Sequence, residues 1–157
     1  MRRYSARTLR CQRGVAAVEF AITAILLVMI IFGVSQLGRA TYQYNTVAKN
    51  TRAAARYLAQ FASGDATATA AAKCLVVYGR TTCGGTALVP GLTTAMVTVC
   101  DASVPACAAT HALQQTGFGL INLVTVTVSG LQFRSMATGY VPNFTLSPIH
   151  ATMPQGS

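Results

Sequence analysis

The longest apolar stretch of the chain lies near its N-terminus. Residues 20–37 contain no charged side chain, and most of them are Ile, Leu, Val, Ala, Phe or Met. These 18 residues, at about 1.5 Å of rise each, cover about 27 Å, which is close to the hydrocarbon thickness of a bilayer. A helix satisfies its own backbone polar groups, as lipid requires. The pattern therefore predicts a single membrane-spanning helix, which we place at residues 15–37.

Beyond residue 37 the apolar positions continue in steps of three and four, which predicts an amphipathic continuation of the helix over residues 38–62. Its small or apolar positions are Leu37, Ala40, Tyr44, Val47, Ala48, Thr51, Ala54, Ala55, Leu58, Phe61 and Ala62. The polar positions that fall between them are Arg39, Gln43, Asn50, Arg52, Arg56 and Gln60. Ser63-Gly64-Asp65 is a typical stop signal.

The remaining residues, 63–157, are predicted to form a small β-rich head. Residues 75–78 are a short apolar run, and residues 94–100 alternate small or polar with apolar side chains. Residues 123–129 alternate most regularly, and each of the three patterns predicts a strand. Three valines of the last run are expected to share one face: Val124, Val126 and Val128.

The segments between these strands are predicted to be connections. Residues 66–73 form either a short helix or a linker, and residues 81–91 contain Gly-Gly and Pro-Gly pairs that are typical of a loop. We expect a compact loop at residues 101–107 and a short helix at 108–117. The tail from residue 139 contains three prolines and is expected to be irregular. The fold class is thus α+β, with three or four antiparallel strands packed on the C-terminal half of one long helix.

The net charge of +9 is concentrated near the N-terminus. Five arginines lie in residues 1–14, a polar leader, and four more basic residues lie in residues 38–56. The head carries three basic residues against two acids, so it has no basic patch and nucleic-acid binding is not expected. The arginines of the leader predict a cytoplasmic N-terminus, with the head on the other side of the membrane.

Cysteine usage agrees with an exported head. Cys11 lies in the leader, and the part predicted to be exported contains Cys74, Cys83, Cys100 and Cys107. An even number of cysteines in an oxidising compartment predicts two disulfides. Three pairings are possible, and we favour the sequential one because short loops close easily. The alternative is a metal site, but no Cys-x-x-Cys pair occurs and His111 and His150 stand alone, so no metal or other cofactor is predicted.

A glycine, an apolar run and an early acid follow the basic leader. Gly14 is followed by Val15-Ala16-Ala17-Val18, then by Glu19-Phe20 and the apolar helix. This order resembles the class III prepilin signal of type IV-like pilins, and specifically the TadE-like minor pilins and pseudopilins of tight-adherence (Flp) pili. The similarity continues through Phe32-Gly33, Gly38-Arg39-Ala40, Asn45 and residues 51–57, and covers about residues 13–60.

The resemblance implies how the chain is processed and where it acts. A membrane-embedded prepilin peptidase would cut after Gly14 and leave Val15 as the new N-terminus. Other pilins would be the lasting partners, through residues 20–37. The mature protein would be a single-pass protein of a bacterial inner membrane with a periplasmic head, and it could enter a pilus used for adherence.

Two other fates of the N-terminal segment compete with this processing. A secretory signal could be cleaved at Gly38-Arg39-Ala40, which loosely fits a small-x-small site. Its apolar region, however, would be longer than the usual ~7–15 residues and would begin with an acid. The other alternative is an uncleaved signal anchor that carries a scaffold or binding domain and never polymerises.

Glu19 is the side chain to which the sequence gives a specific function. It either marks where lipid begins or pairs with a cation, because an ionised carboxylate in lipid is costly. Cleavage after Gly14 would create an α-ammonium group at Val15, about 6 Å away along the axis of the helix. Pairing between neighbouring subunits would then set the register of Glu19 and Phe20 in a helical bundle.

No catalytic constellation is recognisable in the sequence. The chain has only three acids, Glu19, Asp65 and Asp101, so a carboxylate pair would require the last two to meet. No nucleophile elbow and no phosphate-binding glycine loop occur. We therefore expect a structural protein and not an enzyme.

Overall fold

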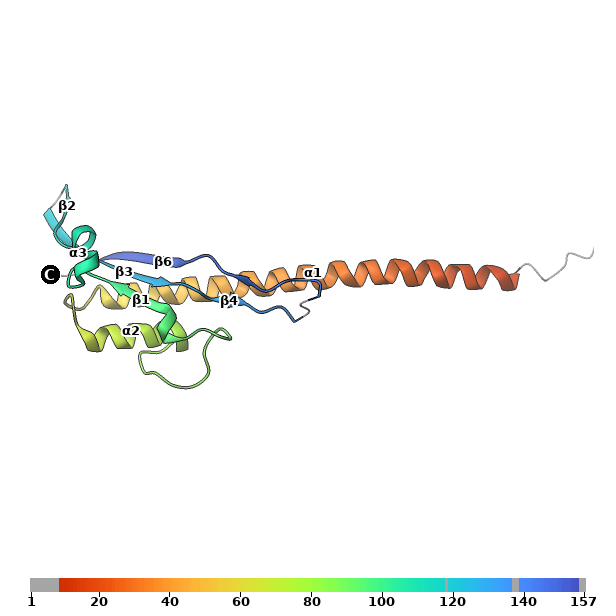
Figure 1. The fold of residues 1–157 in the computed structure, drawn as a ribbon, viewed down its shortest axis with the longest axis horizontal. Coiled ribbons are helices and arrows are strands. Elements are labelled where there is room, and N and C mark those ends of the chain that lie inside the picture. Colours follow the sequence, from red (N-terminus) through yellow and green to blue (C-terminus); the bar gives the residue numbers. More distant parts are fainter. Residues whose placement is uncertain (1–8, 118, 137–138, 156–157) are drawn as a thin grey trace, which may run out of the picture.

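The computed structural model describes residues 9–117, 119–136 and 139–155. Helix α1 (Leu9–Leu58) projects as a long rod, and the other elements gather around its C-terminal half to form a head (Figure 1). The α+β prediction, with one long helix packed by a small antiparallel sheet, is confirmed.

Helix α1 runs for 50 residues, or about 75 Å, without interruption. It begins at Leu9, six residues before the predicted start, and residues 1–8 of the predicted leader lie outside the described residues. It ends at Leu58, before the predicted end at Ala62. The turn after Leu58 is closed by hydrogen bonds that span three residues, as in a 3₁₀ helix. They run from Gln60 N–H to the Tyr57 carbonyl and from Phe61 N–H to the Leu58 carbonyl.

The buried stripe of α1 has the predicted period and most of the predicted residues, with exceptions near the start of the head. It comprises Gln36, Ala40, Gln43, Val47, Thr51, Ala54, Ala55 and Leu58. Leu37 is 68% exposed and Tyr44 is also exposed, although the pattern assigns both to the apolar face, whereas Gln43 is buried. Burial along α1 follows the side of the helix on which the head packs, whatever the polarity of the side chain.

Helix α2 (Ala66–Tyr78) confirms the helical alternative for residues 66–73 and continues through residues 75–78, so the strand prediction for residues 75–78 is wrong. Asp65 caps the helix by accepting hydrogen bonds from Thr67 N–H (2.8 Å) and Ala68 N–H (2.9 Å). Gly79 ends it in the left-handed conformation, at φ 72°. A four-residue apolar run cannot by itself distinguish a strand from the end of a buried helix.

The sheet is organised around β3 (Gly119–Val128). Strand β1 (Val97–Cys100) and strand β6 (Ile149–Gln155) pair antiparallel with β3, and Val128 faces both Val97 and Ile149 in register. Strand β2 (Gln114–Thr116) pairs with the other end of β3. The predicted inward face of β3 is confirmed, because Val124, Val126 and Val128 are all buried.

The remaining short elements correct several predicted boundaries. A 3₁₀ turn, η1 (Thr94–Met96), occupies the first half of the predicted strand at residues 94–100. Helix α3 (Pro105–His111) starts inside the predicted loop and ends before the predicted helix does. Strands β4 (Gln132–Phe133) and β5 (Phe144–Thr145) form a separate hairpin.

The three prolines of the C-terminal tail predict an irregular structure, and this prediction is wrong because β6 lies within the tail. Residues Ile149, Ala151 and Gln155 are buried while His150 and Thr152 are exposed, which is the alternation of a half-buried strand. The prolines thus lie before the strand or near its end, and the prediction overweights them. Residues 156–157 lie outside the described residues.

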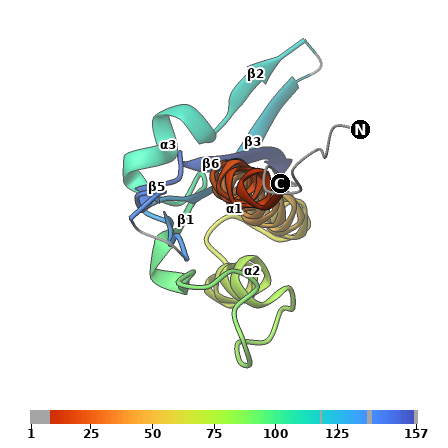
Figure 2. The same cartoon turned by 90° about the vertical axis from the view of Figure 1, so that its right-hand side faces the viewer.

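The core lies where α2 and the sheet both pack on α1 (Figure 2). Its buried members are mostly valine and alanine: Val47, Ala54, Ala55, Leu58, Ala68, Ala72, Val76, Val77, Val89, Leu92, Val97, Val124, Val126, Val128, Leu131, Ile149 and Ala151. The four cysteines of the head lie in the sequential pairs, Cys74–Cys83 and Cys100–Cys107, with Cα–Cα separations of 4.9 Å and 5.7 Å. The first pair ties α2 to the loop that follows it, and the second ties the end of β1 to α3.

Candidate functional site

The N-terminal half of α1 is an apolar rod that the rest of the described chain leaves largely uncovered. It is the one described helix long and apolar enough to cross a membrane, and its most apolar window has a mean hydropathy of 2.7 with no buried residue. Large side chains are widely exposed there, including Phe20 at 75% and Ile30 at 64%. Apolar surface of this extent is typical of contact with lipid or with other protein. This surface supports membrane association.

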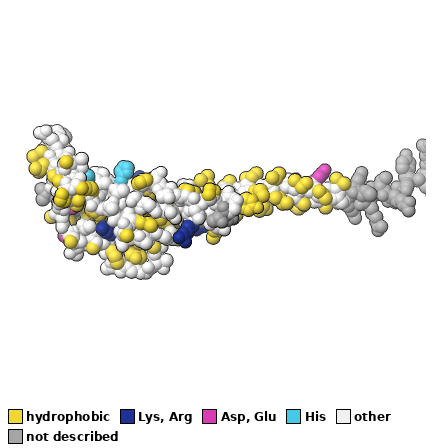
Figure 3. Space-filling model, in the orientation of Figure 1, with side chains coloured by type: hydrophobic (Ala, Val, Ile, Leu, Met, Phe, Trp, Pro, Cys, Tyr) yellow, Lys and Arg dark blue, Asp and Glu magenta, His cyan; other side chains and the backbone are white. Residues whose placement is uncertain are grey.

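Glu19 is the single acid on this rod (Figure 3). Its side chain is exposed, and its backbone carbonyl accepts a hydrogen bond from the Thr23 hydroxyl at 2.8 Å. The next charged residue toward the head is Arg39, 20 positions further along the sequence. Among the described side chains, the surface between Glu19 and Arg39 therefore carries no other charge, so the carboxylate borders apolar surface on the side toward the head.

The predicted processing site lies within the helix. Gly14 and Val15 both belong to α1, and a Cβ added at Gly14 would meet no other atom within 4 Å. Val15 is 61% exposed. The Gly14–Val15 bond is thus open to approach from the side, but its backbone is helical, so a protease that needs an extended substrate would have to unwind this part of the helix.

Residues 14–56 match the model of the family described as TadE-like protein. The N-terminal helix of this chain is TadE-like. The match starts at Gly14 and ends two residues before the end of α1, so it covers the rod and the helical spine of the head. The resemblance to TadE-like proteins of the tight-adherence pilus system is confirmed for this helix. No curated protein and no solved structure matches the chain.

The head that the TadE-like helix supports holds its two acids in structural roles. Asp65 caps α2, and Asp101 is 5% exposed and accepts hydrogen bonds from Gly64 N–H (3.0 Å), Ser103 N–H (2.9 Å) and the Ser103 hydroxyl (2.6 Å). Both carboxylates are thus engaged by neighbouring backbone. Among the described residues no group of three His, Cys, Asp or Glu side chains could hold a metal ion.

Asp101 is the residue whose importance the sequence does not indicate. It joins the turn between α1 and α2 to the turn between β1 and α3. Burial by itself raises the pKa of Asp101, but the hydrogen bonds from the Ser103 hydroxyl and from the N–H groups of Gly64, Ser103 and Val104 together hold that pKa below its ordinary value. The sequence around Asp101 does not reveal this contact, because Gly64 lies 37 residues away.

We expect the stability of the head to depend on the ionisation of Asp101. Because its pKa is lower in the folded than in the unfolded state, its stabilising contribution is present above the unfolded pKa of about 3.9 and is lost as the pH falls through the folded pKa. Asp101→Asn should cost about 1–3 kcal/mol at neutral pH, because the amino group of the carboxamide cannot accept these bonds. Urea unfolding across the acid range measures both effects.

Asp65→Asn is the matched control for this prediction. Asparagine caps helices about as well as aspartate, so this variant should stay close to the wild type at neutral pH. An Asp101→Asn head with unchanged stability and an unchanged acid transition would contradict the assigned role.

His111 has a packing role in the described structure. Its Nε2 lies 2.8 Å from the Thr125 hydroxyl, and its Nδ1 lies 2.8 Å from the Thr110 hydroxyl. Both ring nitrogens thus have partners, and the contact of Nε2 with Thr125 joins α3 to β3. His150 is exposed on β6.

Proposed function

We propose that this protein is a non-enzymatic minor pilin or pseudopilin that takes part in the assembly of a Tad/Flp-type pilus for adherence. The observation that carries the proposal is a TadE-like helix whose apolar half is largely uncovered and bears one acid. The exposed rod needs lipid before assembly and the helices of other pilins afterwards. The head, braced by its two cystine pairs, would remain outside the membrane.

In this proposal the chain has four functional segments. Residues 1–14 are a cytoplasmic leader that a prepilin peptidase removes, and residues 15–37 anchor the protein in the inner membrane. Residues 38–62 continue the helix on the periplasmic side, where the remaining residues pack around it. The arginine-rich leader supports this orientation, because positive flanks stay in the cytoplasm.

One observation favours a second candidate, an uncleaved membrane anchor that presents a scaffold or binding domain. Helix α1 passes through Gly14 without a break, so the proposed cleavage bond is not already extended. The mass of the N-terminal peptide of the membrane-extracted protein distinguishes the two candidates. A chain that begins at Val15 supports the pilin, and a chain that retains its arginine leader supports the uncleaved anchor.

Gly14→Leu should abolish processing and leave the leader attached in a cell with an active prepilin peptidase. A leucine Cβ would meet nothing within the protein, since the position is open, so the block would arise in the peptidase cleft. Intact-mass measurement of the membrane fraction reads the result directly.

Gly38→Leu supplies the matched control for this substitution. Gly38 is also a helical glycine with no atom near its added Cβ, and it lies 24 residues from Gly14. This variant should be processed like the wild type. A Gly14→Leu chain that still matured to Val15 would rule out glycine as the determinant of cleavage.

A further inference from the structure

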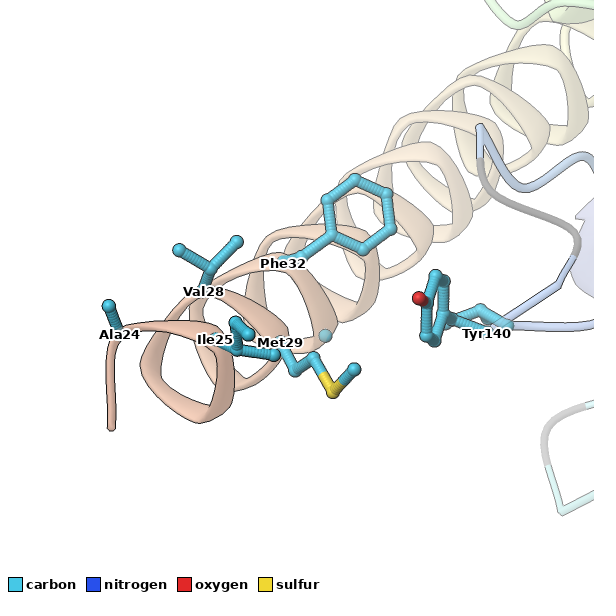
Figure 4. A pocket seen from close by; sticks show the side chains of 8 residues that line it. Ala24, Ile25, Val28, Met29, Phe32 and Tyr140 are labelled. Carbon is cyan, nitrogen blue, oxygen red and sulfur yellow. The ribbon is translucent and has the colours of Figure 1, made fainter. Parts of the chain in front are cut away.

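The hairpin formed by β4 and β5 reaches beyond the head and along the apolar rod. Its strands pair through Phe133 and Phe144, whose ring centroids lie 5.1 Å apart, and the described residues Tyr140 and Val141 that precede β5 lie beside α1 (Figure 1). Tyr140 and Val141 of this segment form one wall of an apolar groove of about 620 Å³. The other wall is α1 between Ala24 and Gly33, and Figure 4 shows Tyr140 across from Met29 and Phe32.

The height of this groove along α1 does not fit a membrane boundary at Leu37. Gln36 is the first buried residue of α1 in the described chain, so the head proper begins there, whereas the groove lies against residues up to about three turns below it. Phe32 is about 7.5 Å below Leu37 along the axis. A bilayer that covered the rod up to Leu37 would therefore surround Tyr140 and Val141.

The described side chains of the segment between β4 and β5 have the chemistry of a membrane interface. Tyr140 is 71% exposed and Met136 is 77% exposed, although both could bury apolar surface. Arg134, in the same connecting segment, is exposed, and the guanidinium of Arg39 lies over Phe133 with its Cζ 5.6 Å from the ring centroid. Tyrosine concentrates at headgroup level, because its ring is apolar and its hydroxyl polar, and arginine binds lipid phosphate.

We propose that Tyr140 and Val141, in the segment between β4 and β5, dock into the interfacial layer of the phospholipid bilayer and set the height and tilt of the head. Tyr140 lies at the level of the glycerol backbone, and lipid fills the groove between Tyr140 and α1. Residues 15–32, at about 27 Å, still span the hydrocarbon below it. The proposal depends on the membrane insertion of α1 that the proposed function requires.

Lipid is the occupant that the position of the groove favours over a second polypeptide. The groove is open to the side and is continuous with the lipid-facing surface of the rod below it. Its wall on α1 belongs to the same apolar segment that needs lipid in the unassembled protein. A helix of another subunit would have to displace this hairpin contact with the bilayer during assembly.

The chain contains no tryptophan, so single-tryptophan variants report on local depth without background. The full chain carrying Tyr140→Trp is reconstituted into vesicles of phosphatidylglycerol and phosphatidylcholine brominated either near the glycerol backbone or near the chain ends. We expect a shift of the emission maximum to shorter wavelength and stronger quenching by the shallow bromines than by the deep ones. Leu26→Trp, on the rod, should be quenched most by the deep bromines, and Leu120→Trp, at the far end of β3, by neither.

Each alternative outcome has a distinct meaning. If Trp at position 26 is quenched while Trp at position 140 is not and emits as in water, the hairpin stands clear of the membrane and the docking proposal is wrong. If position 140 emits at short wavelength without quenching, protein fills the groove and lipid does not. If position 26 is also unquenched, α1 is not in the bilayer, and the proposed membrane anchor fails together with the docking.

Discussion

Glu19→Val is expected to give a protein that inserts into the membrane and loses its leader but does not enter the pilus or its assembly complex. Insertion should improve, because the substitution removes an ionisable group from an apolar segment. Assembly should fail, because the α-ammonium of Val15 would then lack its carboxylate partner in lipid. Losing one member of a buried charge pair costs about 2–5 kcal/mol, enough to lower incorporation at least about tenfold. Immunoblots of membrane and sheared-pilus fractions measure this split.

Two further variants separate charge from polarity in this experiment. Glu19→Gln keeps the shape of the side chain but removes its charge, so it should fail like Glu19→Val. Thr23→Val removes a polar group one turn away whose hydroxyl bonds to the Glu19 carbonyl and not to its carboxylate, so it should assemble normally. Normal piliation with Glu19→Val would show that the acid only marks the membrane boundary.

The apolar rod could be predicted from the sequence because its signals are local. An uncharged run of 18 residues, a preceding basic leader and an acid near the start are all contained within residues 1–37. The regular alternation of Val124, Val126 and Val128 is equally local, and their burial is confirmed. The sequential cystine pairs follow from short loop lengths in the same way.

The parts that are predicted wrongly depend on contacts between distant residues. Whether residues 75–78 are helical depends on Asp65, which starts the helix ten residues earlier. Whether the tail forms a strand depends on β3. The prolines by themselves disfavour a strand, and only the hydrogen bonds to β3 stabilise one. Gln43 is buried and Leu37 is exposed because of where the head packs on α1, which the local pattern does not reveal.

The hairpin illustrates the same limit at the functional site. Nothing in the local pattern connects Tyr140 with Met29 or Phe32, which lie over 100 residues earlier. The apolar run predicts that a membrane segment exists. Only the packed structure places a second segment beside it and so bears on where the membrane ends.

Removal of residues 149–157 is expected to unfold the head while leaving the rod helical. Strand β6 supplies one full side of the β3 ladder, and Ile149 and Ala151 are part of the core. The truncation removes both this ladder and these two core side chains. We expect the free energy lost in this way to exceed the stability of a small domain, which is about 5–15 kcal/mol. Near-ultraviolet circular dichroism of the detergent-solubilised protein should lose its tertiary signal, while the far-ultraviolet helical signal largely persists. A truncated chain with an intact tertiary signal would show that β6 is dispensable.

A point substitution tests the contact of β6 with the end of α1, which joins residues 97 positions apart in the sequence. Gln155 Nε2 donates hydrogen bonds to the carbonyls of Phe61 (3.0 Å) and Leu58 (3.4 Å), and its Oε1 accepts one from the Ser63 hydroxyl at 2.8 Å. Leu58 is the last residue of α1 and Phe61 lies in the turn that follows, where carbonyls no longer receive the regular helical hydrogen bond. Gln155→Ala should therefore lower the free energy of unfolding by about 1–3 kcal/mol.

His150→Ala, at an exposed position of the same strand, should change the free energy of unfolding by less than about 0.5 kcal/mol. Equal effects of the two substitutions in urea titrations would mean that Gln155 does not cap the helix, and the side chain would then count only as part of the strand.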